Sequence, residues 1–172
     1  MKYKKNRVIL RQNKFVFPTK QFRTILNGIV RQDRDACVGG MNKFEYITDT
    51  KPDEGQMRDL IFANKLVKHL KSNAIALAKN NMLLSNGIGQ TSRIDALKQA
   101  ISKAKNFGLS LEGAVMASDA FFPFADCVQI AHEAGITAVI QPGGSIHDQD
   151  SIDYCNKNNV AMVSTGIRHF RH

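Results

Sequence analysis

The sequence has no tryptophan, only three cysteines and four prolines among its 172 residues, and no long apolar run. No stretch approaches the roughly 20 apolar residues that a transmembrane helix needs, and the basic start lacks the apolar segment of a secretory signal. Cys37, Cys127 and Cys155 are odd in number and far apart, so they predict neither a disulfide framework nor a metal site. These absences favour a soluble, cytoplasmic protein with reduced cysteines and no metal.

Acidic side chains are also few, because 24 lysines and arginines face 15 aspartates and glutamates, for a net charge of +9. Such an excess favours anionic partners such as phosphates, folyl glutamates or nucleic acid. The basic residues concentrate in the first 34 positions and around residues 65–71, without the interleaved aromatic residues of an RNA-binding surface. The pattern therefore disfavours nucleic acid, although a role in binding it stays open.

The chain is predicted to form one α/β module over residues 51–172, preceded by strands and loops over residues 1–50 that pack on it. Apolar runs predict strands, and amphipathic stretches predict helices. The strands are expected at 73–79, 82–85, 114–117, 136–140 and 160–163, and the helices at about 52–71, 92–107, 124–133 and 148–156. Asn80 and Asn81 fit a two-residue hairpin turn. The alternation predicts a three-layer module in which helices flank a mostly parallel sheet.

Three loops should meet at one rim, because ligands of such sheets bind beyond the carboxyl ends of the strands. The loops are residues 118–124, 141–145 and 164–172. Paired glycines in the second loop, before a predicted helix start near Asp148, suit an anion, although such a turn is more often only a turn. Residues 87–93 likewise place glycines before a predicted helix, with Arg93 in its first turn. They match neither a dinucleotide fingerprint nor a Walker loop.

The first loop is strongly apolar, with three phenylalanines around a proline in Phe121–Phe124. Such side chains either cover a flat ligand ring, such as a pterin or a base, or fill the core beneath the loop. The neighbouring Asp119 and Asp126 fit helix-capping roles.

The third loop contains a cluster of cations and imidazoles in Thr165–His172. It suits either the binding of an anion with proton transfer, or a solvated basic tail.

Several segments together resemble one protein family. KHLKSNAIALAK, GIGQTSR, SDAFFPFAD, GITAVIQPGGSI and TGIRHFRH occur in the order found in the aminoimidazole carboxamide ribonucleotide (AICAR) transformylase part of the bifunctional purine biosynthesis protein, which also carries inosine monophosphate (IMP) cyclohydrolase. NGIVRQDRD is similar more loosely. The resemblance implies a cytidine-deaminase-like module, the second of two copies in that enzyme.

The reaction that the resemblance implies is formyl transfer from 10-formyltetrahydrofolate to AICAR in IMP biosynthesis, without a metal. In that enzyme, a Lys-His pair in the first copy does part of the acid-base work. Because this chain matches only the second copy, it would act as a half-enzyme. The alternative is a non-catalytic remnant that binds nucleotide, folate or a partner. A homodimer, or association with a first-module subunit, is the implied assembly.

Site residues follow from the same motifs. Asn73 resembles an asparagine that contacts the substrate and takes part in catalysis, while Arg168 and His172 resemble a substrate-binding and catalytic pair. Phe121 is similar to a residue that touches both ligands. Phe121, Pro123 and Phe124 resemble residues that line the folate site. Asp126 resembles a residue that makes a polar contact to the pterin. Ala125 and His147 depart from the family, which usually has arginine at both places.

Overall fold

The computed structural model describes residues 14, 16, 18–37 and 44–171. The chain divides into two compact units, Met1–Ala36 and Cys37–His172. This boundary precedes the predicted division at residue 50, because the short strand β3 (Glu45–Tyr46) already pairs with the sheet of the second unit. A two-residue strand is too short to show a periodic pattern, so its place could not be predicted from the sequence.

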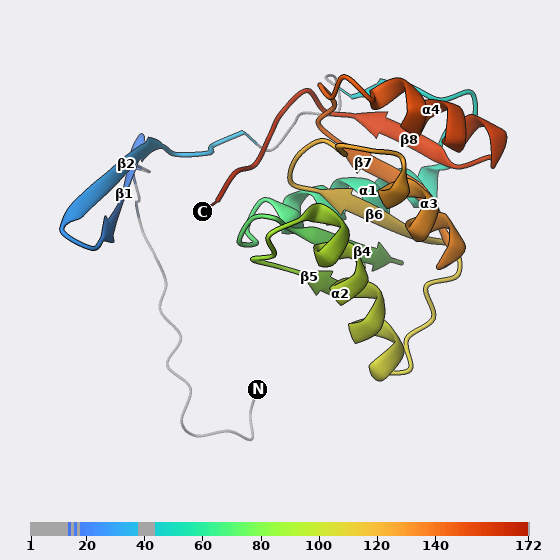
Figure 1. Cartoon of the computed structure of the whole chain (residues 1–172), viewed down its shortest axis with the longest axis horizontal. Helices are drawn as coiled ribbons and strands as arrows, with labels where there is room; N and C mark the ends of the chain where they lie inside the picture. The colour runs from blue at the N-terminus through green and yellow to red at the C-terminus, as the bar shows by residue number, and fades with distance from the viewer. Residues whose placement is uncertain (1–13, 15, 17, 38–43, 172) are drawn as a thin grey trace. The chain divides into compact units, whose positions relative to one another are not determined.

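The first unit contains one antiparallel hairpin, formed by β1 (Lys20–Ile25) and β2 (Gly28–Asp33) and drawn in blue in Figure 1. Leu26, at the turn, has a positive φ of 47°. Lys20 and Asp33, which face each other across the open end, form an ion pair. The hydrogen bond and charge of Lys20 lower the pKa of the Asp33 carboxyl.

The second unit is built on a six-stranded sheet in the order β3-β8-β7-β6-β4-β5. Its other elements are α1 (Glu54–Val67), β4 (Ile75–Lys79), β5 (Met82–Gly87), α2 (Arg93–Asn106), β6 (Ala114–Ser118), α3 (Asp126–Glu133), β7 (Ile136–Gln141), α4 (Asp148–Lys157) and β8 (Ala161–Ser164). β6, β7 and β8 run parallel, whereas β3, β4 and β5 join through antiparallel pairs. The predicted α/β class is confirmed, with a mixed sheet.

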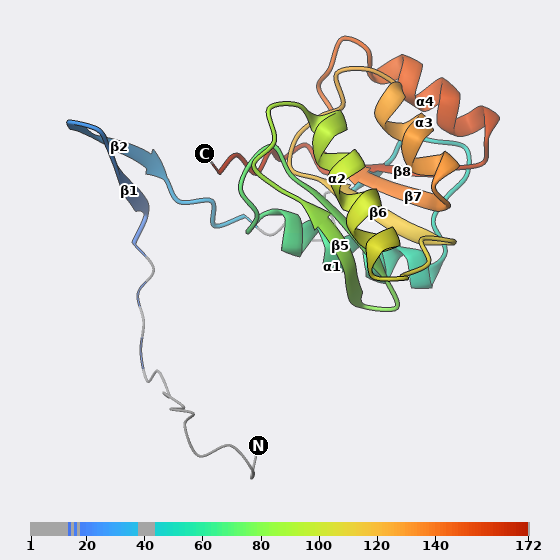
Figure 2. The same ribbon diagram turned by 60° about the horizontal axis from the view of Figure 1, so that its bottom comes forward.

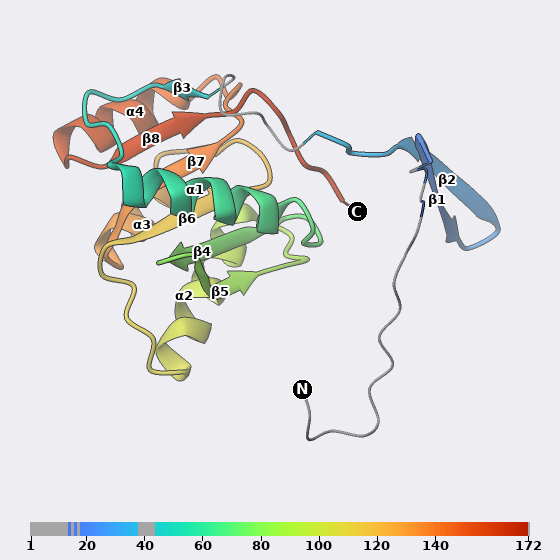
Figure 3. The ribbon, with the colours of Figure 1, turned by 180° about the vertical axis from the view of Figure 1, so that it is seen from behind.

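Helices cover both faces of this sheet. Figures 1 and 2 show α2, α3 and α4 on one face, and Figure 3 shows α1 lying across the other. Successive strand residues point to opposite faces. Along β6, Met116 therefore packs in the cluster under α2 and α3, while Val115 and Ala117 pack against α1. The strands read as continuous apolar runs because both faces are buried.

Local signals fix the ends of several elements. Asp53 and Gln56 form a capping box at the start of α1. At the start of α2, the Ser92 hydroxyl accepts a hydrogen bond from the N–H of Asp95. Asn80 and Asn81 both have positive φ and connect β4 to β5, which confirms the predicted two-residue turn. Among the described residues, no helix has the length and apolar character needed to cross a bilayer.

Candidate functional site

The predicted rim lies at one edge of the sheet, where the parallel strands β6, β7 and β8 all end. Asn73 is at the same edge, since it precedes β4, which runs antiparallel to β6. Two backbone bonds join the loops, from Thr165 N–H to the Gln141 carbonyl (2.9 Å) and from Gly166 N–H to the Pro142 carbonyl (3.1 Å). The rim is therefore one connected surface.

A buried ion pair lies beneath the rim. The guanidinium of Arg93 donates to Asp119 Oδ1 at 2.6 Å, and the exposed fractions of the two side chains are 8% and 0%. Arg93 also donates to Asn73 Oδ1 (3.1 Å) and to the Phe121 carbonyl (3.3 Å). One guanidinium thus joins the start of β4, the end of β6 and the apolar loop.

Asn73 uses its whole amide group within the protein. Its nitrogen donates to the carbonyls of Gln90 (3.0 Å) and Thr91 (3.1 Å), while its oxygen accepts from Arg93. The orientation of the amide is fixed, because carbonyls only accept and a guanidinium only donates. The contact between Asn73 and a substrate stays a prediction, and only the second lone pair of Oδ1 is left for it.

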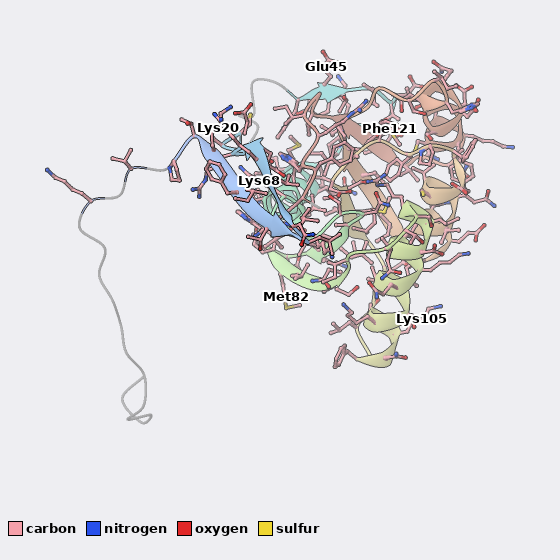
Figure 4. All side chains as sticks on the ribbon, turned by 60° about the vertical axis from the view of Figure 1, so that its left-hand side comes forward. Lys20, Glu45, Lys68, Met82, Lys105 and Phe121 are labelled. Carbon is pink, nitrogen blue, oxygen red and sulfur yellow. The ribbon has the colours of Figure 1, made fainter. Side chains whose placement is uncertain are left out.

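The three phenylalanines have three different environments; one of them fills the core, while the covering of a ligand ring by the others stays a prediction. Phe122 is fully buried in the core, and its N–H donates to Gln141 Oε1 at 3.3 Å. Phe121 and Pro123 are partly buried. Phe124 is 56% exposed, with its ring 5.2 Å from that of His147. Figure 4 shows Phe121 well apart from Lys105, which lies near the end of α2.

Arg168 is a cation that the rim presents outward. Its guanidinium carbon lies 4.7 Å from the centre of the Phe121 ring, a cation–π arrangement, and its side chain is exposed. No acidic side chain pairs with Arg168 among the residues that the structure describes. A Cβ at Gly144, which has a φ of +97°, would approach the Arg168 nitrogen to 3.3 Å. Glycine therefore leaves room for this guanidinium.

Beyond Thr165 and Gly166, the segment after β8 is also bonded to the module through His169 and Arg171. His169, which is 1% exposed, donates its N–H to the Asp119 carbonyl at 2.8 Å. Arg171 and Ser72 exchange two hydrogen bonds of 2.9 Å, one of them through the serine hydroxyl. The backbone up to Arg171 is thus held against the rim. The predicted catalytic His172 lies outside the described residues.

The glycine loop before α4 already holds a negative charge. The N–H groups of Gly144 (2.6 Å) and Ser145 (3.1 Å) both donate to Asp148 Oδ2. Because the protein's own carboxylate takes these donors, an anion would have to displace it. The expectation of an anion at this loop is therefore wrong for this arrangement, in which the loop is a closed turn.

The two aspartates beside the apolar loop do not act as helix caps. Asp119 pairs with Arg93, and the N-cap of α3 is Ala125, which makes no side-chain capping bond. Asp126 is the first residue of α3, and its buried Oδ1 has no hydrogen-bond partner in the described part of the chain. Burial, and secondly the charge of Asp126, raise the pKa of the Cys127 thiol to about 12.

Sequence reasoning missed the partnership between Arg93 and Asp119. It placed Arg93 in the first turn of its helix and Asp119 after its strand, but it paired neither with the other. Asp119 was predicted to lie on the rim, but the segment of Arg93 was not, so no signal in the sequence paired the two charges. Within the described residues, no group of three or more histidine, cysteine, aspartate or glutamate side chains could hold a metal ion.

Solved structures similar to this chain include deaminases. A dCMP deaminase from the cyanophage S-TIM5 is 17% identical, with a TM-score of 0.45, over 65% of this chain and 98% of that one. A diaminohydroxyphosphoribosylaminopyrimidine deaminase/5-amino-6-(5-phosphoribosylamino)uracil reductase from Thermotoga maritima is 16% identical, with a TM-score of 0.41, over 67% and 35% of the two chains.

Curated relatives are much more similar in sequence, and each is named a bifunctional purine biosynthesis protein PurH. The relative from Bacteroides thetaiotaomicron is 59% identical over 98% of this chain, and that from Clostridioides difficile is 49% identical over all of it. The chain spans about a third of their length, 33% in both cases. A family model described as AICARFT/IMPCHase bienzyme matches residues 1–103, more than half of the chain. The chain therefore belongs to the AICARFT/IMPCHase bienzyme family.

Proposed function

We propose that this chain contributes the ligand-binding rim to formyl transfer from 10-formyltetrahydrofolate to AICAR, a step of purine biosynthesis. The observation that carries the proposal is the exposed guanidinium of Arg168, which lies on the Phe121 ring and has no acidic partner among the described residues. An arginine fork binds phosphate or carboxylate through two parallel hydrogen bonds. Family membership and the names of the relatives point to the nucleotide and the folate as its ligands.

The chemistry requires groups that the rim supplies in part. The aromatic amine of AICAR is a weak nucleophile, since its lone pair is withdrawn into the ring and the carboxamide. Proton removal must therefore accompany C–N bond formation, while a cation or donor stabilises the tetrahedral oxygen. We assign proton removal to His172, four residues further along the chain, while Arg168 binds an anionic group of the ligand.

The folate is proposed to lie against the apolar loop. Phe124 exposes its ring beside His147, and Phe121 and Pro123 are partly buried on the same segment. Asp126 Oδ1 is buried without a hydrogen-bond partner in the described part of the chain. Leaving a buried acceptor unpaired costs about 1–3 kcal/mol, which an N–H donor of the pterin would recover.

A binding role without turnover is the second candidate function. It is favoured by Asn73, whose two amide hydrogens are both bonded to carbonyls of the protein. A catalytic asparagine that donates to the substrate would first have to break one of these bonds. The oligomeric form that we propose is a homodimer, or association with a first-module subunit, in the cytoplasm.

The test is a formyl-transfer assay with AICAR and 10-formyltetrahydrofolate. The chain is assayed alone and mixed with the part of the Bacteroides relative to which it does not align. We expect turnover in the mixture, loss of turnover in His172→Ala, and a KM for AICAR raised about tenfold or more in Arg168→Ala. Arg58→Ala, at an exposed arginine on α1, is the matched control and should leave the kinetics unchanged.

The outcomes separate the two candidate functions. Tight AICAR binding to the mixture, without any formyl product, would support the binding role. Wild-type affinity and turnover in Arg168→Ala would contradict the site itself.

A further inference from the structure

Asparagine followed by glycine occurs twice in the sequence, at Asn27 before Gly28 and at Asn86 before Gly87. This pair is reactive, because glycine has no Cβ to keep its backbone nitrogen away from the preceding asparagine side chain. The nitrogen can attack the Cγ carbonyl of the asparagine and close a five-membered ring. Ring closure needs a backbone that can move, so the surroundings of each pair decide whether it proceeds.

The first pair lies at the turn of the β1–β2 hairpin. Ile25 and Gly28 are the last paired residues of the two strands, so Leu26 and Asn27 form the two-residue turn. Leu26 is fully exposed and has a φ of 47°, a left-handed conformation that is unfavourable for a side chain of this size. Asn27 is also exposed, and its side chain makes no hydrogen bond to another described residue.

Little in the structure keeps this turn closed. A hairpin of two strands is by itself only marginally stable in water. Neither cluster of buried apolar side chains includes a described residue of β1 or β2. Phe22, Ile25 and Ile29 are instead all more than half exposed. Local opening of the turn, which frees the Gly28 nitrogen from the strand pairing, is therefore easy.

The second pair has the same chemistry but a closed environment. Asn86 and Gly87 lie in β5, and Gly87 packs so closely under α2 that a Cβ there would be 1.8 Å from the Ala96 carbonyl oxygen. The Lys103 ammonium donates to the backbone carbonyl (2.7 Å) and to Oδ1 (2.8 Å) of Asn86. Ring closure here requires β5 to separate from both α2 and β4, so this pair is an internal reference.

We propose that Asn27 is a site of spontaneous deamidation, and that its product makes the hairpin a substrate for an enzyme that methylates isoaspartyl carboxylates. In the first step, the Gly28 backbone nitrogen gives its proton to solvent base and bonds to Asn27 Cγ. The bond between Cγ and Nδ2 breaks, and Nδ2 takes up a proton and leaves as ammonia. Water then opens either carbonyl of the succinimide ring, which yields aspartate or isoaspartate.

This modification changes both the charge and the shape of the turn, and it is independent of formyl transfer. A neutral amide becomes a carboxylate, which lowers the net charge of +9 by one. In isoaspartate the main chain runs through the former side chain, so the backbone of the turn gains a methylene group. Turn length sets strand register in a hairpin. We therefore expect the pairing of Ile25 with Gly28 to be lost in the isoaspartyl form.

Peptide mass spectrometry of the whole chain, incubated at 37 °C in neutral buffer, measures both pairs at once. Cleavage after Arg23 and Arg31 releases residues 24–31, in which Asn27 is the one asparagine. We expect Asn27 to deamidate at least about tenfold faster than Asn86 in the folded chain, because the two sites differ in the cost of local opening. In concentrated urea, the two rates should agree to within about threefold, since the protection of Asn86 is lost.

Gly28→Ala is the matched variant. Its Cβ would lie 3.7 Å from the Ile25 carbonyl oxygen, an ordinary contact, so the turn is retained while the methyl group hinders the attacking nitrogen. We expect deamidation of Asn27 to slow at least about tenfold, because ring closure depends on how often the nitrogen reaches the attack geometry. Methyl transfer from S-adenosylmethionine by an isoaspartyl methyltransferase should label the aged wild-type peptide and not the variant.

Three results would overturn the proposal. Equal rates at Asn27 and Asn86 in the folded chain would show that the hairpin turn is protected as well as β5. An unchanged rate in Gly28→Ala would show that the backbone nitrogen is not the attacking group. Aspartate without isoaspartate at Asn27 would show that water attacks the side chain directly, with no ring intermediate.

Discussion

Replacing Phe122 by alanine tests how the apolar loop after β6 is divided between core and ligand surface. The Phe122 side chain is fully buried within the cluster under α2 and α3, so the truncation removes a whole ring from a close-packed interior. Such a change costs about 3–5 kcal/mol, part of it from the cavity left behind. For a chain of this size, each kcal/mol lowers Tm by roughly 2–4 °C, so we expect a fall of about 6–20 °C.

The neighbouring phenylalanine gives the matched control. Phe124 is 56% exposed, and its removal should change stability by no more than about 0.5 kcal/mol. Under the proposed function, Phe124→Ala should nevertheless weaken folate binding, whereas Phe122→Ala should act on ligand binding only through unfolding.

Thermal unfolding followed by far-UV circular dichroism, with urea titration at 25 °C, measures both variants. If the Tm of Phe122→Ala falls by less than about 3 °C, the loss is smaller than truncation of a buried ring causes, and the assigned burial is refuted. An equal fall in Phe124→Ala would show that the two rings do not divide the loop as the structure indicates.

Three further predictions concern the module as a whole. Burial raises the pKa of the Cys127 and Cys155 thiols from 9.0 to about 12, so as pH rises the unfolded chain loses these protons before the folded one does. The free energy of unfolding should therefore fall between pH 9 and 12, by about 1.4 kcal/mol per cysteine at pH 10. This fall should be smaller in the alanine variants of the two cysteines. Gly87→Ala should cost about 1–3 kcal/mol or more in urea unfolding, because its Cβ would lie 1.8 Å from the Ala96 carbonyl oxygen of α2. Asp59→Ala should destabilise by about 1–3 kcal/mol in the same assay, since it leaves two N–H groups of the β4–β5 turn without their acceptor.

Most of the fold could be predicted because its signals are local. The positive-φ turn at Asn80–Asn81 and the alternation of apolar runs with amphipathic stretches place β4 to β8 and α1 to α4 within a few residues. The order of strands is a different matter. The antiparallel pairing of β4 with β6, and of β3 with β8, depends on contacts between distant segments, which no local pattern reports.

The rim was predictable as a place but not as an arrangement of side chains. The chain order of strands and helices shows that three loops converge. It does not show that Phe122 turns inward while Phe124 turns outward, since both are apolar and lie two positions apart. Likewise, Asp148 could be placed at a helix start, but its bonds to Gly144 and Ser145 depend on how the loop folds back.

Two arginines of the rim show how burial divides one residue type between two tasks. Arg93 is buried and neutralised by Asp119, and three acceptors of the protein take hydrogen bonds from its two terminal nitrogens. Because Asp119 neutralises it, Arg93 contributes little to the long-range attraction of an anion. Arg168 is exposed over Phe121 and pairs with no acid among the described residues, so its field reaches outward and its hydrogen bonds remain to be made. Attraction of an anion to this rim should therefore depend more on Arg168 than on Arg93.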